Sequence, residues 1–206
     1  MDQSHGREDI ILTIPNIITL GRILLTPIFI LCLFYDHPWS KLWALAIFFI
    51  AGITDAYDGY YARKYNLVTP EGKFLDPLAD KILVSSAFIS FAIIGVIDYW
   101  MVVLIIFRDL FVTGLRMAMN RKGLEMVTSN IAKAKTVIQL NIIVFILIVL
   151  GVKGLSLAWT YPLLEVVKKY HLIYNFTLLV TLFTVLTGFT YLYSNRNTII
   201  GFLKSE

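Results

Sequence analysis

The chain of 206 residues contains few of the side chains that most disulfide-stapled or zinc-binding domains need. It has a single cysteine, Cys32, so no intrachain disulfide can form. Its three histidines, His5, His37 and His171, lie far apart in the sequence, whereas the ligands of a metal site must converge. The sequence therefore predicts neither a disulfide framework nor a histidine or cysteine metal centre.

Apolar residues are abundant instead. They make up 58% of the chain, against about 45–50% in ordinary soluble domains, and the mean hydropathy is +0.74. We see no internal repeat, low-complexity segment or linker, so we predict one all-α integral membrane domain over residues 1–206. Six apolar stretches are long enough to cross a bilayer: Ile17–Tyr35, Leu42–Tyr61, Pro77–Ile97, Tyr99–Met119, Ile131–Val152 and Leu172–Tyr193.

The distribution of positive charge orients these six predicted spans. An even number of spans puts both termini on one side of the membrane. Of the 18 lysines and arginines, all but four fall on the side of the termini, and the positive side of a membrane protein is the cytoplasmic one. We therefore expect cytoplasmic termini, cytoplasmic loops at 62–76 and 120–130, and retention of the first span, because its flanks lack a signal-cleavage pattern.

The opposite face is marked by aromatic residues. Tryptophans and tyrosines that gather near it are typical of the aromatic belt of a membrane protein: Trp39, Trp43, Trp100, Trp159, Tyr161 and Tyr170. The long external connection Lys153–Tyr170 contains Pro162 and has mixed polarity. We expect it to lie at the membrane interface rather than to span the membrane.

Four aspartates occur where the second and third apolar stretches meet. Asp55 and Asp58 are three residues apart, and Asp76 and Asp80 are four apart. At 3.6 residues per turn, each pair lies on one face of a helix. Pro77 suits the first turn of a helix, so we expect the third span to start there.

Carboxylates at membrane depth are costly and need a compensating partner. Four that converge would repel one another unless some were protonated or cations held them. Two divalent ions would satisfy them, and an ion pair of this kind clamps the oxygens of a phosphoryl group in transfer. Ligands that are all oxygen favour Mg²⁺ or Mn²⁺ over Zn²⁺. The sequence therefore predicts a two-ion site for phosphoryl chemistry.

The segment from Asp55 to Asp80 resembles the signature of the CDP-alcohol phosphotransferase family. The signature covers 26 residues and this chain matches each of its fixed positions: Asp55, Asp58, Gly59, Ala62, Arg63, Gly72, Asp76 and Asp80. The resemblance implies a fold of six transmembrane helices with a cytoplasm-facing polar active-site cavity. It also implies transfer of a phosphatidyl or similar group from a CDP-linked donor to an alcohol, with release of CMP.

The resemblance also implies roles for the four aspartates. Asp55, Asp58 and Asp76 would hold two metal ions, Mg²⁺ or Mn²⁺. Asp80 would complete the metal site and act as the catalytic base on the acceptor hydroxyl.

The donor site is implied in the same way. Gly59 and Ala62 follow Asp55 on the same helix stripe, and their small side chains would leave room for the cytidine. Arg63 and Gly72 would help to seat the CDP group, so the implied donor-binding set is Asp55, Gly59, Ala62, Arg63 and Gly72.

Three other segments resemble one branch of the family, the bacterial phosphatidylglycerophosphate synthases, whose acceptor is sn-glycerol 3-phosphate: Pro15–Arg22, Arg108–Arg116 and Lys133–Gln139. Their cations could bind an acceptor that carries a phosphate. The predicted acceptor-binding residues are Arg116, Lys133, Lys135 and Arg108. The alternative for these cations is contact with anionic lipid headgroups.

Spacing distinguishes the members of this cationic set. Lys133 and Lys135 are two residues apart, so a regular helix cannot aim both at one spot. Arg116 is therefore the strongest acceptor candidate. We expect Asp109 to pair with a nearby cation rather than to bind metal.

These inferences predict a phosphatidyltransferase of the bacterial cytoplasmic (inner) membrane, with its active site on the cytoplasmic side. Its expected partners are CDP-diacylglycerol, sn-glycerol 3-phosphate, membrane lipids and a second copy of the chain, and no nucleic acid. Inositol phosphate or phosphatidylglycerol is the alternative acceptor. An alternative from another class of protein is a divalent-cation transporter. Arg63 disfavours it, because a path for cations gains nothing from an arginine.

Overall fold

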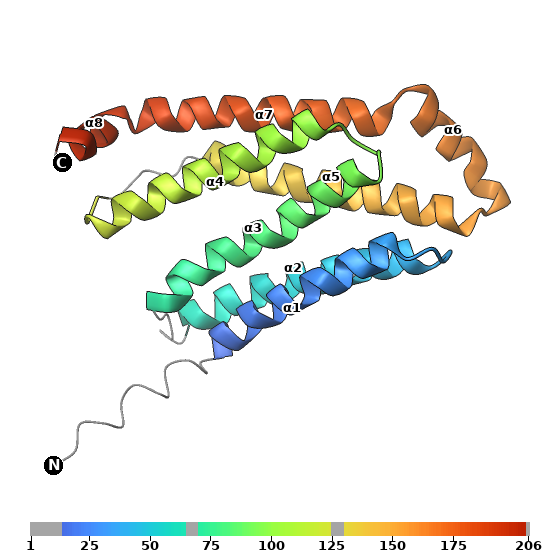
Figure 1. Cartoon of the computed structure of the whole chain (residues 1–206), viewed down its shortest axis with the longest axis horizontal. Coiled ribbons are helices and arrows are strands. Elements are labelled where there is room, and N and C mark those ends of the chain that lie inside the picture. The colour runs from blue at the N-terminus through green and yellow to red at the C-terminus, as the bar shows by residue number, and fades with distance from the viewer. Residues whose placement is uncertain (1–13, 65–69, 125–129, 205–206) are drawn as a thin grey trace, which may run out of the picture. The chain divides into compact units, whose positions relative to one another are not determined.

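The computed structural model describes residues 14–64, 70–124 and 130–204, with side chains for 21–54, 81–120, 122–124 and 134–201. Within these ranges every regular element is a helix (Figure 1), which confirms the all-α class. The elements are α1 (Ile14–Phe34), α2 (Ser40–Lys64), α3 (Pro70–Ile93), α4 (Tyr99–Arg121), α5 (Asn130–Leu155), the 3₁₀ turn η1 (Ala158–Thr160), α6 (Tyr161–Lys169), α7 (Leu172–Ser194) and α8 (Arg196–Lys204).

Five of the six predicted spans match a helix to within three residues at each end, and the third does not. Helix α3 starts at Pro70, so the prediction that Pro77 lies in its first turn is wrong. The reason is that Pro70 can itself take the first position, where the missing N–H costs nothing. Pro77 then lies inside the helix, where proline removes one backbone hydrogen bond.

Helix α3 also ends earlier than predicted, at Ile93 rather than Ile97. Gly95 has a φ of +75°, a left-handed conformation that glycine adopts without steric cost. The N–H of Val96 donates to the carbonyl of Phe91 at 2.9 Å, and that of Gly95 donates to Ala92 at 2.9 Å. This pair of bonds is the glycine-dependent motif that terminates many helices.

The chain divides into two compact units, residues 1–86 and 87–206. In the first unit α1 and α2 form an antiparallel hairpin (Figure 1). The Ser40 hydroxyl lies 2.7 Å from the carbonyl oxygens of Tyr35 and His37, and the Lys41 ammonium donates to Tyr35 at 2.8 Å. These bonds hold the turn between the two helices.

Small and aromatic side chains alternate along the contact between α1 and α2. Ala44 and Ala51 are fully buried, which lets the two helices approach closely. The rings of Phe29 and Phe48 pack with their centroids 5.9 Å apart. The first two aspartates of the signature, Asp55 and Asp58, thus lie in the C-terminal part of α2, a helix that is packed against α1.

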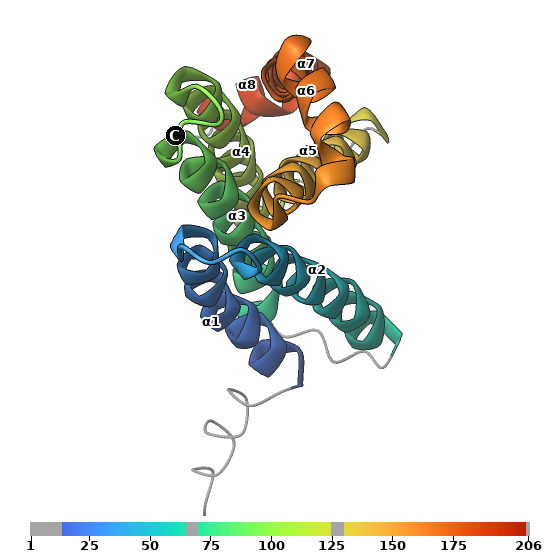
Figure 2. The same cartoon turned by 90° about the vertical axis from the view of Figure 1, so that its right-hand side faces the viewer.

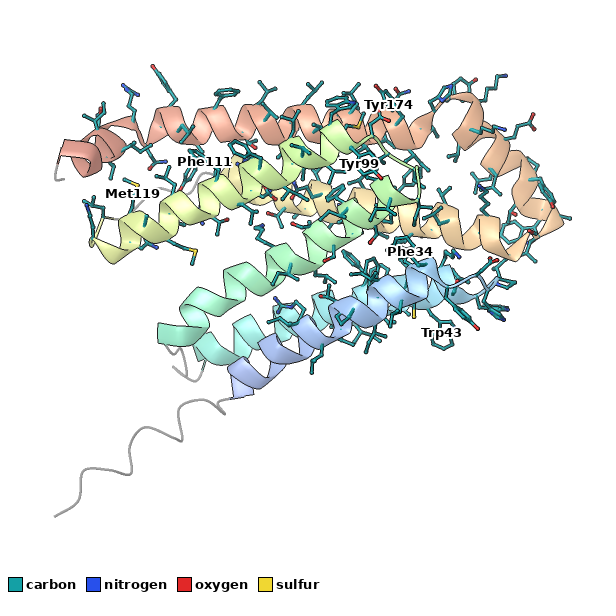
Figure 3. The ribbon with its side chains drawn as sticks, viewed as in Figure 1. Phe34, Trp43, Tyr99, Phe111, Met119 and Tyr174 are labelled. Carbon is teal, nitrogen blue, oxygen red and sulfur yellow. The ribbon has the colours of Figure 1, made fainter. Side chains whose placement is uncertain are left out.

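In the second unit α7 runs beside both α4 and α5 (Figures 1 and 2). Helices α4 and α7 start at the end of the unit where α5 finishes, and η1 and α6 connect α5 to α7 there. Tyr99 and Tyr174 lie near this end, and Met119 lies at the other end of α4 (Figure 3). The exposed Trp100 and Trp159, two residues of the predicted aromatic belt, belong to the same end.

Two helical segments of the described chain are long and apolar enough to cross a membrane, Ala134–Leu155 and Leu172–Ser194. Gly21–Phe34, Ser40–Thr54 and Lys81–Ile93 are shorter apolar helices. Large apolar side chains such as Phe107 and Phe189 are about two thirds exposed, at 66% and 68%. Exposed apolar surface on this scale suits contact with lipid.

Helix α8 is a feature that the apolar pattern did not predict. It follows α7 directly, and the amide of Asn195 bonds to the carbonyl of Tyr191 at 2.9 Å where the two helices join. Ile199 of α8 packs against a buried cluster of Val112, Met119 and Tyr191. One apolar contact face is thus enough to order a helix of nine residues.

Candidate active site

All eight fixed residues of the signature lie on helices. Asp55, Asp58, Gly59, Ala62 and Arg63 belong to α2, and Gly72, Asp76 and Asp80 belong to α3. The helical backbone supports the expectation that each aspartate pair lies on one face. The side chains of all eight residues, and that of Lys133 in the first turn of α5, lie outside the described residues.

The chemistry of this donor set suits hard divalent cations. Carboxylate oxygens are the ligands that Mg²⁺ and Mn²⁺ prefer. Among the side chains that the structure describes, no group of three or more His, Cys, Asp and Glu residues gathers as a metal site would require. The four aspartates stay the predicted metal ligands.

The second unit contains a buried ion cluster, formed by Arg108 and Asp109 of α4 and Lys135 of α5. The Lys135 ammonium forms an ion pair with Oδ1 of Asp109, and Nη1 of Arg108 lies 3.4 Å from the same oxygen. Lys135 is 2% exposed and Asp109 is 3% exposed. The expectation that Asp109 pairs with a cation is confirmed, and two of the predicted acceptor residues meet at this carboxylate.

Helix α7 holds Arg108 from the other side. The guanidinium Nη2 donates to the hydroxyl of Thr187 at 3.2 Å. A Cβ placed on the neighbouring Gly188 would lie 3.0 Å from Cγ of Arg108, so the arginine stem crosses α7 at the one position that has no side chain. Nε of Arg108 is buried and has no hydrogen-bond partner among the described residues.

Arg116 lies two helical turns beyond Arg108 on the same face of α4. Its Nε donates to the hydroxyl of Tyr191 at 3.2 Å, and its guanidinium carbon is 5.4 Å from the centroid of that ring. It is half-buried, whereas Lys135 is buried. Arg116 is therefore more open to a ligand than Lys135, and its assignment as an acceptor residue stays a prediction.

One further polar pair lies deeper in the same unit. Gln139 follows Lys135 by one turn of α5 and is 1% exposed, and its amide nitrogen lies 3.4 Å from the hydroxyl of Thr184. Its amide oxygen has no hydrogen-bond partner among the described residues. Together with the ion cluster, this pair makes the interface of α4, α5 and α7 polar.

Sequence reasoning missed the contribution of α7 to this site. The buried face of α7 carries threonines at helical spacing, beside the buried Gly188: Thr177, Thr181, Thr184 and Thr187. Their spacing of three or four residues in an otherwise apolar helix is the signal that would have predicted a polar interface.

The contact at Gly188 gives a prediction for stability. We expect Gly188→Ala to destabilise the protein by about 1–3 kcal/mol, because the new methyl group meets the stem of Arg108 in a packed interface. Gly114→Ala in α4 is the matched control: an added Cβ there meets nothing within 4 Å, so the higher helix propensity of alanine should stabilise by up to about 1 kcal/mol. Thermal unfolding of the purified variants measures both, and a neutral Gly188→Ala would contradict the close approach.

An apolar cleft lies between residues of α4 and α7. The cleft has a volume of about 210 Å³. Among the described residues its walls include the exposed Phe107, Phe111 and Phe189, and Arg108 is the one charged residue there. The lining is suited to hydrocarbon rather than to a polar ligand.

Comparison with known proteins gives a consistent family assignment. Residues 12–170 match the sequence model of the family described as CDP-alcohol phosphatidyltransferase. The chain is 44% identical over 135 residues to the CDP-diacylglycerol–glycerol-3-phosphate 3-phosphatidyltransferase of Bacillus subtilis (strain 168), which covers 60% of this chain and 70% of that relative. It is 34% identical over 178 residues to the protein of the same name from Rickettsia bellii (strain RML369-C), covering 86% of this chain and 92% of the relative.

A third similar protein is named a probable phosphatidylglycerophosphate synthase, from Mycobacterium tuberculosis (strain CDC 1551 / Oshkosh). The identity is 44% over 124 residues, which is 59% of each of the two chains. The family match extends over more than half of this sequence and includes the whole aspartate signature together with the buried ion cluster. The chain therefore belongs to the CDP-alcohol phosphatidyltransferase family.

Proposed function

We propose that this chain transfers the phosphatidyl group from CDP-diacylglycerol to sn-glycerol 3-phosphate, giving phosphatidylglycerophosphate and CMP. The observation that carries the proposal is the similarity to the Rickettsia bellii protein named for this activity, which extends over 86% of the chain. The cations of α4 and α5 support it, because an acceptor that carries a phosphate needs them and one such as serine does not.

The proposal includes the setting of the enzyme. The chain would cross the bacterial inner membrane six times as a homodimer, with its termini and its active-site cavity on the cytoplasmic side. The apolar helices Ala134–Leu155 and Leu172–Ser194 support a membrane location. The apolar cleft between α4 and α7 supports contact with the acyl chains of lipids.

Two Mg²⁺ or Mn²⁺ ions would be held by Asp55, Asp58, Asp76 and Asp80, whose oxygens fit these ions. When bound, such ions offset negative charge on a pyrophosphate and make CMP a better leaving group. Gly59, Ala62, Arg63 and Gly72 would seat the CDP group beside them.

The protein's own residues then have two tasks. Asp80 takes the proton of the acceptor hydroxyl as that oxygen forms a bond to the phosphorus that carries the diacylglycerol. The bond from this phosphorus to the oxygen of CMP breaks, and CMP leaves with the electron pair. The predicted acceptor residues, Arg108, Arg116, Lys133 and Lys135, hold the phosphate of the acceptor, which orients its hydroxyl for attack.

One assay on detergent-purified protein tests the proposal. The protein is supplied with CDP-diacylglycerol, Mg²⁺ and labelled sn-glycerol 3-phosphate, and in parallel with myo-inositol 1-phosphate or phosphatidylglycerol as acceptor. Transfer of label into lipid with glycerol 3-phosphate alone supports the acceptor. Transfer only to another acceptor would overturn the assignment of glycerol 3-phosphate as the acceptor, while the assignment of CDP-diacylglycerol as the donor would stand.

Arg116 gives a prediction within this function. We expect Arg116→Ala to raise the KM for glycerol 3-phosphate about tenfold or more, the cost of one charged hydrogen bond, with little change in the KM for CDP-diacylglycerol. Tyr191→Phe is the matched variant, because it removes the hydroxyl that accepts from Arg116 but keeps the ring beneath it. It should raise the acceptor KM less. If Arg116→Ala raised only the KM for CDP-diacylglycerol, Arg116 would not belong to the acceptor pocket.

A further inference from the structure

Asp109 is the point where the acceptor cations of two helices meet. Its Oδ1 contacts the ammonium of Lys135 from α5 and the guanidinium of Arg108, its neighbour on α4. The carboxylate and the lysine are both almost completely buried. Charges removed from water in this way persist only when they are paired with good geometry.

The two cations differ in how they are held. Arg108 is also anchored on α7, by the Thr187 hydroxyl and by the fit of its stem over Gly188. The ion pair of Lys135 with Asp109 is buried on both sides and bridges residues 26 positions apart in the chain, whereas the contact of the more exposed Arg108 with Asp109 is long, at 3.4 Å. A change at Asp109 should therefore act mainly through Lys135.

We infer that Asp109 is a positioning residue for the acceptor: it fixes the Lys135 ammonium, and to a lesser degree the Arg108 guanidinium, where the acceptor phosphate binds. The inference rests on the proposed function, in which these cations hold that phosphate. Asp109 itself does not touch the acceptor, because a carboxylate would repel a phosphate. Its charge is offset by two cations, so the cluster of these three side chains still carries a net positive charge.

The test replaces Asp109 with the nearly isosteric asparagine, which cannot form the ion pair. We expect Asp109→Asn to raise the KM for glycerol 3-phosphate about tenfold or more, as for the loss of one charged hydrogen bond, while the KM for CDP-diacylglycerol stays within about twofold. Asp109→Glu keeps the charge and should recover part of the acceptor affinity. If the asparagine variant does not fold, the glutamate variant carries the test, with the same selective but smaller rise in acceptor KM.

A double-mutant cycle separates positioning from general loss of structure. Because Asp109 acts through Lys135, the pair Asp109→Asn/Lys135→Gln should have nearly the acceptor KM of Lys135→Gln alone. Thr160→Val is the matched control, since Thr160 is a buried threonine of η1, beyond the end of α5 that is opposite Lys135, and its hydroxyl donates to the carbonyl of Leu157 at 2.7 Å. It should leave both KM values unchanged. The inference would be overturned if the two single substitutions raised the acceptor KM by factors that multiply in the double variant. It would also be overturned if Asp109→Asn changed the donor KM and the acceptor KM equally.

A direct binding measurement distinguishes failure of the inference about Asp109 from failure of the proposed function. Calorimetric titration of glycerol 3-phosphate into the full-length protein measures its Kd without turnover. Wild-type protein that binds glycerol 3-phosphate but does not transfer to it refutes the proposed function, and the inference then stands if Asp109→Asn weakens this binding about tenfold. Wild-type protein that does not bind it, or an asparagine variant that binds equally well, overturns the inference.

Discussion

Replacing Asp80 with asparagine is expected to lower kcat by about 10²–10⁴-fold, the usual contribution of a general base. The amide keeps the size of the side chain but cannot accept the proton of the acceptor hydroxyl. CDP-diacylglycerol binding should change little, because three other carboxylates of the signature remain to hold the metal ions. Steady-state transfer to glycerol 3-phosphate gives kcat, and equilibrium binding of labelled CDP-diacylglycerol gives the donor affinity.

A control for this variant is Asp98→Asn. Asp98 precedes α4 at the aromatic end of the second unit, where its carboxylate accepts a hydrogen bond from the Trp100 indole at 3.1 Å. Neutralising it should leave kcat unchanged. Loss of donor binding in parallel with turnover in Asp80→Asn would contradict the assignment of Asp80 as the base.

Chelation of divalent cations is expected to reduce transfer to background, and Mg²⁺ or Mn²⁺ should restore it. Four carboxylates that converge would repel one another strongly without counter-ions, because like charges at short range are unfavourable. The apo-protein should therefore lose activity and also lose stability, because repulsion between α2 and α3 is no longer offset. Activity in EDTA and the unfolding temperature with and without metal measure the two effects.

The number of bound ions sharpens this prediction. Equilibrium titration with Mn²⁺ should show two sites per chain in the wild type. Asp58→Asn should need a higher Mg²⁺ concentration for half-maximal activity, whereas Asp98→Asn should match the wild type. Full activity in the presence of chelator would rule out a metal-dependent reaction, and one ion per chain would replace the two-ion arrangement.

Most of the helices could be predicted from the apolar pattern, because a bilayer-length apolar stretch has few other stable structures. The errors fall where that pattern fails. The first turns of α3 contain Glu71 and Lys73, so a search for apolar residues starts the helix too late. Helix α8 is too short for a span, and it is ordered by the packing of Ile199 on residues of α4 and α7.

The sequence by itself determined the family and the register of the aspartate signature. Spacings of three and four residues are local, and helical periodicity alone converts them into shared faces. Only the tertiary structure decided how the predicted acceptor cations are arranged. Lys135 reaches Asp109 across 26 residues, and Arg108 reaches Thr187 across 79. Helix periodicity cannot predict such contacts, because they depend on which faces of α4, α5 and α7 pack together.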